Sequence, residues 1–206
     1  MSRKERRPSS RSVRTPAGWN EIPESRRNEF VGVTALVDYA DGRVVGTKFP
    51  ADVLDSDTIE CHWKYGVTGD KKGFQRADVL REFPFPEDLG RYVTEALVWN
   101  RIAMRYRTRF VNEIWATVEY LKDGLSTRNN SLRIASPKAT FLQLAELIAS
   151  GGRLPFRARV LASASLLRFA LHARRWSHCE VIPRSCLPFA IPLGVAVFLR
   201  DRIRFG

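Results

Sequence analysis

The pattern of apolar residues changes once along the chain, and this change limits the fold class. Residues 30–50 contain two β-rich runs on either side of Asp41-Gly42, a dipeptide typical of hairpin turns. Residues 58–67 alternate in polarity, and residues 109–121 are rich in valine, isoleucine and aromatic residues, so each range predicts a strand. From residue 136 onward the spacing is helical. The sequence predicts an α/β fold, α+β-like in this chain, with a mixed sheet followed by C-terminal helices.

Three more segments are expected in the first half of the chain. Pro23 would begin a short helix within residues 22–30. Residues 69–86 contain several glycines and prolines and predict a loop with one helical turn. Residues 93–107 have apolar residues in helical register and predict a helix.

Two helices are expected near the C-terminus. Ser136 and Pro137 are typical of a helix start, and Gly151 of a helix end. Residues 155–175 predict a second helix with one apolar and one basic side. The expected apolar stripe is Phe156, Val160, Leu167 and Leu171, and the arginines expected opposite it are Arg157, Arg168 and Arg175.

Length and composition favour one domain, or one with an extension. The chain has 206 residues, of which 44% are hydrophobic, which is enough for a core. Residues 1–17 are expected to form a disordered basic arm, and residues 18–125 the main domain. Residues 126–206 are expected to form a helical extension that is a candidate for membrane association.

The charge balance points to anionic partners. Thirty-four lysines and arginines against 22 acidic residues give a net charge of +12, which suits nucleic acid, lipid head groups or a nucleotide-bearing substrate. The three cysteines, Cys61, Cys179 and Cys186, form no paired framework, and the first residues have no apolar signal core. These features predict a cytoplasmic protein, with peripheral attachment to the inner face of the cell membrane as an option.

The last apolar segment, residues 186–199, is too short to cross a bilayer. It has 14 residues and contains Pro188, Pro192 and Gly194, whereas a spanning helix needs about 20 apolar residues. Arginines flank the segment on both sides. Two interpretations stay open, a core helix or an interfacial segment whose arginines meet anionic lipid.

Candidate metal ligands are weak in this sequence. Asp55-Ser56-Asp57 spells the D-x-D pattern with which many glycosyltransferases hold a divalent metal, but a long apolar strand does not precede it. A turn or a helix cap is the preferred interpretation. His172, His178, Cys179 and Cys186 do not have the spacing of a closed zinc site. We therefore predict no metal ligand in this chain.

Glu95 is the strongest candidate for chemistry. It precedes Trp99, Ile102 and Tyr106 at helical spacing, so a carboxylate heads an apolar stripe. A carboxylate in the first turn is also favoured by the helix dipole, by about 0.3–1 kcal/mol. The residue is therefore either a stabilising helix-start residue or a general base acting on a hydroxyl.

Three motifs resemble those of bacterial glycosyltransferase family 2 enzymes. They are G-D-K-x-G-F-x-R at residues 69–76, F-P-F-P-E at residues 83–87 and E-x-L-V-W-N-R-I-A-x-x-Y at residues 95–106. The likeness covers about residues 19–204 and corresponds to the second, acceptor-side half of the family's GT-A fold. It implies inverting transfer of a sugar from a nucleotide donor to a cell-surface polysaccharide or a lipid-linked sugar.

The resemblance also implies roles for single residues. Glu95 would deprotonate the acceptor hydroxyl, and Trp99, Asn100 and Arg101 would shape the acceptor side. Asp70 and Lys71 would lie on the rim of the cleft, and Arg76 would meet a phosphate. The family uses Mg²⁺ or Mn²⁺, whose ligands we do not expect in this chain.

Two departures from the family pattern stand out. Lys72 occupies a position where the family usually has an aromatic residue. The nucleotide-binding half, roughly a hundred residues of β–α–β units, has no counterpart before Trp19. We therefore expect a partial GT-A fold, whose donor half belongs to a longer gene product or a partner polypeptide.

A non-catalytic alternative stays open beside the enzyme. The chain could be a basic binding or scaffold module for a membrane surface, nucleic acid or a partner transferase. Nucleic acid is the least favoured of these partners, because the aromatic residues cluster around Glu95 and not among the arginines.

Overall fold

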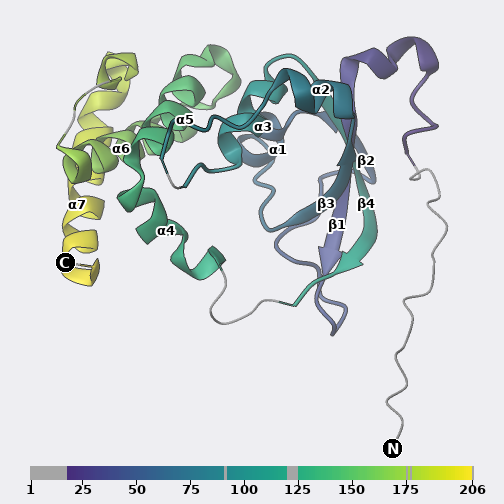
Figure 1. Ribbon diagram of the computed structural model, residues 1–206, viewed down its shortest axis with the longest axis horizontal. Coiled ribbons are helices and arrows are strands. Elements are labelled where there is room, and N and C mark those ends of the chain that lie inside the picture. Colours follow the sequence, from purple (N-terminus) through teal and green to yellow (C-terminus); the bar gives the residue numbers. More distant parts are fainter. Residues whose placement is uncertain (1–17, 91, 120–124, 175, 177, 206) are drawn as a thin grey trace, which may run out of the picture.

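The structure is a computed structural model that describes residues 18–90, 92–119, 125–174, 176 and 178–205. It is an α/β fold with a mixed four-stranded sheet of order β2-β4-β1-β3, and helices follow on one side (Figure 1). The strands are β1 (Phe30–Asp38), β2 (Val53–Ser56), β3 (Lys71–Gln75) and β4 (Arg107–Thr117). The predicted fold class, a mixed sheet with C-terminal helices, is confirmed. The expected basic arm, residues 1–17, lies outside the described residues.

The two long strands form the centre of the sheet. β1 and β4 are parallel neighbours, and the short strands β2 and β3 pair antiparallel at the two edges. Nearly every residue of β1 is buried, which suits a central strand packed on both faces. Between β1 and β4 the chain forms β2, β3 and the helices α1 (Thr58–Trp63), α2 (Ala77–Glu82) and α3 (Ala96–Ala103).

The strand predicted over residues 58–67 is wrong, because the chain forms helix α1 there. Asp57 caps this helix, and its Oδ1 accepts a hydrogen bond from the backbone N–H of Glu60 at 2.9 Å. Glu60 also pairs with Lys64 one turn later, at 2.6 Å. The cap and the ion pair are local and favour a helix, so the short alternation of apolar residues was misleading.

The loop predicted over residues 69–86 is also wrong in part. It contains the edge strand β3 and helix α2, which together occupy most of the range. β3 consists of KKGFQ and has little intrinsic strand preference; it forms because β1 offers it a ladder of partners from Gly32 to Leu36. Helix α3 is shorter than the predicted range 93–107, and β4 begins at Arg107.

Three other local predictions fare better. Pro23 precedes a 3₁₀ helix, η1 (Glu24–Glu29). The turn at Asp41-Gly42 is present, with Gly42 at φ +81°, but its second arm contributes only an isolated bridge between Asp38 and Val44. The strand predicted over residues 109–121 is confirmed as β4.

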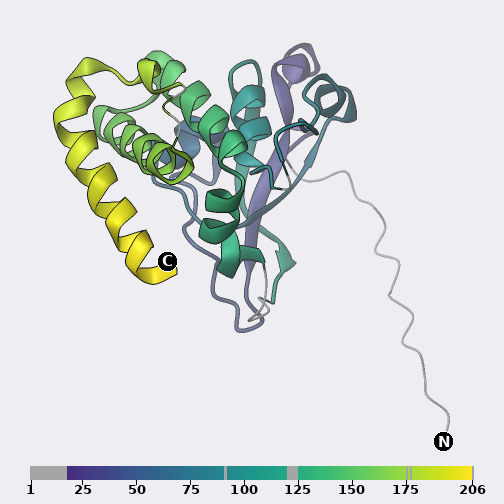
Figure 2. The ribbon, with the colours of Figure 1, turned by 60° about the vertical axis from the view of Figure 1, so that its left-hand side comes forward.

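The C-terminal part is a layer of helices packed on α1 and α3. It consists of α4 (Leu125–Ala135), α5 (Pro137–Ala149), η2 (Gly151–Arg153), α6 (Phe156–Ala173), η3 (Cys179–Val181), η4 (Arg184–Cys186) and α7 (Leu187–Phe205). Its largest core cluster includes Ile59 of α1 and Ala103 of α3. α7 is the outermost element, at the edge of the molecule farthest from the sheet (Figures 1 and 2). The predicted segment boundary near residue 125 adjoins residues 120–124, which lie outside the described residues.

The predicted two sides of helix α6 need a correction. Arg168, expected on the basic outer side, is only 8% exposed and bonds to Asp201 of α7. Phe156, expected in the buried stripe, is 45% exposed. The buried side of α6 contains alanines with Leu166 and Phe169, because small residues let the neighbouring helices approach closely. Among the described helices, none combines the length and the apolar character needed to cross a membrane.

Gly32 allows the close approach of β1 and β3. A Cβ atom at this position would lie 2.0 Å from the carbonyl oxygen of Phe74. We therefore expect Gly32→Ala to lower the free energy of unfolding by about 1–3 kcal/mol, because the sheet must open to admit the methyl group. Urea unfolding measures the change. Gly152→Ala is the matched control, since no atom lies within 4 Å of its Cβ position; equal stability losses in both variants would contradict the argument.

Candidate functional site

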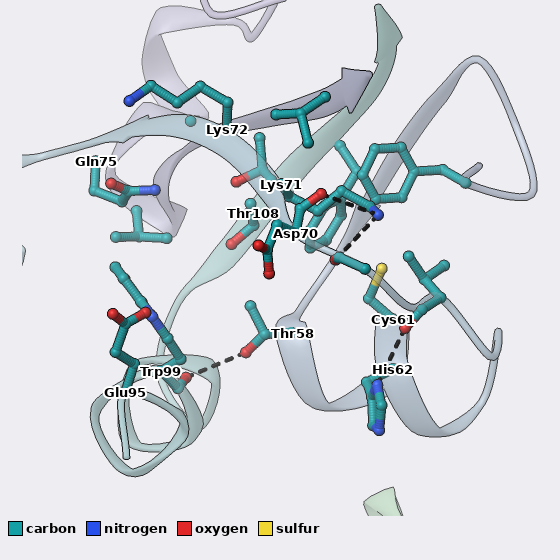
Figure 3. A pocket seen from close by; sticks show the side chains of 18 of the residues that line it. Thr58, Cys61, His62, Asp70, Lys71, Lys72, Gln75, Glu95, Trp99 and Thr108 are labelled. Atoms are coloured by element: carbon teal, nitrogen blue, oxygen red, sulfur yellow. Dashed lines mark hydrogen bonds between the residues drawn. The ribbon is translucent and has the colours of Figure 1, made fainter. Parts of the chain in front are cut away.

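A cavity of about 970 Å³ is lined by residues from segments far apart in the sequence. The lining comes from β1, α1, β3 and the loop before it, α3 and β4. Figure 3 shows Glu95 and Trp99 on one side of this space and Asp70 and Lys71 on another. The sheet order brings these residues together, since α3 precedes central strand β4 and β3 is the edge strand beside β1.

Glu95 occupies the position directly before helix α3, on the cavity wall. Its carbonyl oxygen accepts hydrogen bonds from the N–H groups of Val98 and Trp99 at 3.0 and 3.1 Å, so its backbone starts the helix. Its side chain is exposed and makes no capping hydrogen bond to the first turn. A helix cap therefore does not explain why the carboxylate is at this position. No described residue forms a hydrogen bond or an ion pair with this carboxylate, so it can accept a proton or a hydrogen bond from a molecule in the cavity.

Trp99 is half-buried beside Glu95 and fixes this wall of the cavity. It packs on the cluster formed by Val31, Val98 and Ile102. Its carbonyl oxygen accepts a hydrogen bond from Thr58 Oγ1 at 3.2 Å, which joins α3 to α1 (Figure 3). The indole of Trp99 thus contributes apolar surface to the cavity wall next to a carboxylate.

Asp70 and Lys71 lie where the glycine-rich loop enters β3. The Nζ atom of Lys71 donates to the carbonyl oxygens of Thr68 and Gly69, at 2.6 and 3.2 Å, and burial lowers the pKa of Lys71. Lys71 therefore holds the loop in place. Asp70 is exposed and lines the same cavity, on another side from Glu95 (Figure 3).

Three other predicted site residues lie elsewhere. Arg101 forms a two-point ion pair with Glu146 of α5, at 2.9 and 2.8 Å, and connects α3 to the helical layer. Arg76 pairs with Asp78 and donates to the backbone carbonyl oxygens of Arg27 in η1 and Phe30 in β1. Neither these two arginines nor Asn100 is among the residues that line the cavity. The cavity thus joins Glu95 and Trp99 with Asp70 and Lys71, and leaves the other three outside.

The cavity also contains polar residues that the sequence did not single out. Thr58 and His62 come from α1, Gln75 from β3 and Thr108 from β4. The signal that was available is the spacing of Asp57 and Glu60, which is a helix-start pattern. Recognising that helix would have placed Thr58 and His62 on a single helix, one turn apart.

Cys61 also lines the cavity, but its thiol is unsuited to nucleophilic chemistry. Burial raises the pKa of Cys61 to about 12, so the thiol stays protonated at neutral pH. Catalysis through a thiolate at this site is therefore disfavoured.

The two carboxylates of Asp55-Ser56-Asp57 do not fit a divalent metal, because both are engaged elsewhere. Asp55 binds Arg109 through both carboxylate oxygens at 2.7 Å, and Asp57 both caps α1 and receives a hydrogen bond from Arg153 at 2.9 Å. The helix-cap interpretation of Asp57 is thus confirmed. Within the described ranges, no three histidine, cysteine or acidic side chains come together in an arrangement that could hold a metal ion. We derive no step through Mg²⁺ or Mn²⁺ from these residues.

Comparison of the sequence with models of protein families, with curated proteins and with solved structures found no match. The resemblance to family 2 glycosyltransferases therefore rests on the three quoted motifs. The geometry of the cavity is independent of that resemblance.

Proposed function

We propose that this chain is the acceptor-side half of an inverting family 2 glycosyltransferase, with Glu95 as the general base. The observation that carries the proposal is the exposed, uncapped carboxylate of Glu95 beside Trp99 on the wall of a 970 Å³ cavity. The motif that contains both residues is one of the three that carry the resemblance. The acceptor class is a cell-surface polysaccharide or a lipid-linked sugar.

The proposed reaction needs one proton acceptor from this chain. Glu95 takes the proton of an acceptor hydroxyl as the hydroxyl oxygen forms a bond to the anomeric carbon of the donor sugar. The bond between that carbon and the nucleoside diphosphate breaks on the opposite face, and the electron pair leaves with the diphosphate. Attack opposite the leaving group inverts the anomeric configuration.

The other cavity residues position the acceptor in this proposal. The ring of Trp99 supports the apolar face of a sugar, and the carboxylate of Asp70 accepts hydrogen bonds from sugar hydroxyls across the cavity. The groups that bind the nucleotide and its Mg²⁺ or Mn²⁺ belong to a donor half, as a further part of the same protein or a partner polypeptide. We place the reaction in the cytoplasm, because Cys61, Cys179 and Cys186 are free thiols.

The acceptor role can be tested without the donor half. We expect the chain to bind oligosaccharides weakly and Trp99→Leu to weaken that binding about tenfold, since the stacking face is lost. The chain is titrated with a panel of soluble glycans, and saturation-transfer NMR detects the binding.

Trp176→Leu is the matched control, because Trp176 is exposed and lies outside the cavity lining. Its affinity should equal that of the unmodified chain. Absence of binding to every glycan tested, or equal affinity in the Trp99→Leu variant, would remove the acceptor site from this cavity.

A further inference from the structure

Among the described residues, helix α7 packs on α6 along one narrow stripe. Ala190, Gly194 and Asp201 are buried against α6. At Gly194 the helices are so close that a Cβ atom would lie 2.8 Å from the carbonyl oxygen of Ala164. Because Phe189 meets Phe156 near the start of both helices and Asp201 meets Arg168 near the end, α6 and α7 lie side by side in the same direction.

The side of α7 that faces away from α6 is apolar along its whole length. At 100° per residue, Pro192, Val195, Leu199 and Ile203 lie opposite the buried stripe. Leu199 is 54% exposed and Ile203 is 88% exposed. Phe189, 57% exposed, extends this surface towards the start of the helix, where the exposed ring of Phe156 lies beside it. We call this surface, formed by Phe189, Pro192, Val195, Leu199 and Ile203, the outer ridge.

Arginines border the outer ridge on both sides. On the same helical projection Arg202 lies on one flank and Arg200 and Arg204 lie on the other, and all three are exposed. The only acidic residue of α7, Asp201, is buried and bonded to Arg168. Every charge that α7 presents outward is therefore positive.

We propose that the outer ridge docks on the surface of an anionic lipid bilayer, with α7 in the plane of the interface. Apolar side chains would enter the boundary between head groups and acyl chains, and the flanking arginines would reach the lipid phosphates. The position of α7 at the outer edge, farthest from the sheet, places no other described helix or strand beyond it on that side (Figures 1 and 2).

The charges favour a bilayer over a second copy of this chain. Two outer ridges placed face to face would bring arginines together with no acidic residue of α7 to balance them. An anionic bilayer supplies both an apolar phase and negative charge, which are the two properties that complement this surface. This inference goes beyond the proposed glycosyltransferase function and does not depend on it.

Vesicle flotation with the full chain tests the proposal. We expect binding to vesicles of phosphatidylcholine with phosphatidylglycerol and much weaker binding to phosphatidylcholine alone. The double variant Leu199→Asp with Ile203→Asp should lower the partition coefficient by roughly a hundredfold or more, because two apolar anchors are lost. The control variant is Val53→Asp with Leu80→Asp. It replaces two exposed apolar residues on other faces and adds the same charge. It should bind the vesicles as the unmodified chain does.

A second comparison separates α7 from the basic arm. Replacement by glutamine of three arginines of α7, Arg200, Arg202 and Arg204, should weaken vesicle binding roughly fivefold for each arginine and remove most of the salt dependence of the binding. Replacement by glutamine of three arginines of the basic arm, Arg6, Arg7 and Arg11, should weaken vesicle binding less. Two results would overturn the proposal. One is vesicle binding that is lost in the variant of the basic arm but kept in the variants of α7, and the other is equally strong binding to neutral and to anionic vesicles. A dimer that the double variant dissociates, without vesicle binding, would assign the ridge to a second copy.

Discussion

Replacing Glu95 by glutamine is expected to lower the rate of sugar transfer by about 10²–10⁴-fold, the usual contribution of a general base. Glutamine keeps the shape and the hydrogen-bonding oxygen of the side chain but cannot accept the proton. The carboxylate is exposed on the cavity wall and makes no cap to α3, so the substitution should lower the free energy of unfolding by no more than about 0.3–1 kcal/mol, the usual contribution of a carboxylate near a helix N-terminus. Acceptor binding should also be nearly unchanged, and the loss should fall on kcat.

The measurement requires this chain together with a donor-binding half. Release of nucleoside diphosphate is followed for a panel of nucleotide sugars, with polysaccharide or lipid-linked sugar extracts as acceptors. Glu87→Gln is the matched control, because Glu87 is exposed and lies outside the cavity lining. Turnover of the Glu95→Gln variant within a few-fold of the control would exclude Glu95 as the base, while glycan binding at Trp99 could still stand.

Replacing Arg168 by methionine is expected to lower the free energy of unfolding by about 3–5 kcal/mol, the usual cost of leaving one member of a buried ion pair without its partner. The Asp201 side chain is 2% exposed and receives a bond from Arg168 Nε and a contact from His172 Nε2 at 3.1 Å. Methionine fills the space but supplies no donor.

Chemical unfolding of the single and double variants checks this expectation. Arg157→Met, an exposed position on the same helix, should change stability by less than about 0.5 kcal/mol. Adding Asp201→Leu to Arg168→Met should restore much of the loss, because the unpaired carboxylate is removed. Equal effects of Arg168→Met and Arg157→Met would show that the pair does not stabilise the fold.

The ion pair between Arg168 and Asp201 should also make the stability of the fold depend on pH in the acidic range. Burial opposes ionisation of Asp201, but hydrogen bonds from Arg168 and His172 outweigh it and hold the pKa of Asp201 below its ordinary value. A depressed folded pKa contributes stability above the unfolded value of about 3.9, and this contribution is lost as the pH falls through the folded pKa. The double variant Arg168→Met with Asp201→Leu should lack the part of the pH dependence that comes from Asp201.

The elements that could be predicted from the sequence are those whose signals are local. β4 has a long run of strand-forming residues, and α5 has a proline at its first position and a glycine after its end. β3 could not be predicted in this way, because Lys71–Gln75 becomes a strand only through its pairing with β1. Arg168 was assigned to solvent because its partner Asp201 lies on another helix, 33 residues later.

The residues of the candidate site likewise divide into those with a local sequence signal and those placed by the tertiary fold. Glu95 and Trp99 are one helical turn apart, so periodicity alone could place them on one side of a helix. The position of Asp70 in the same cavity depends on the order of the strands, which no local pattern encodes. Arg76 and Arg101 were assigned to substrate from the resemblance, whereas their hydrogen bonds in the fold go to backbone carbonyls and to Glu146.

The stacking of α7, α6, α5 and α3 sets a height for the cavity above any surface on which α7 rests. These helices contact one another in that order, and neighbouring packed helices are about 8–10 Å apart, so Glu95 would stand up to roughly 25–30 Å above the lipid. A lipid-linked acceptor would then need a stem of up to that length to bring its hydroxyl group to Glu95.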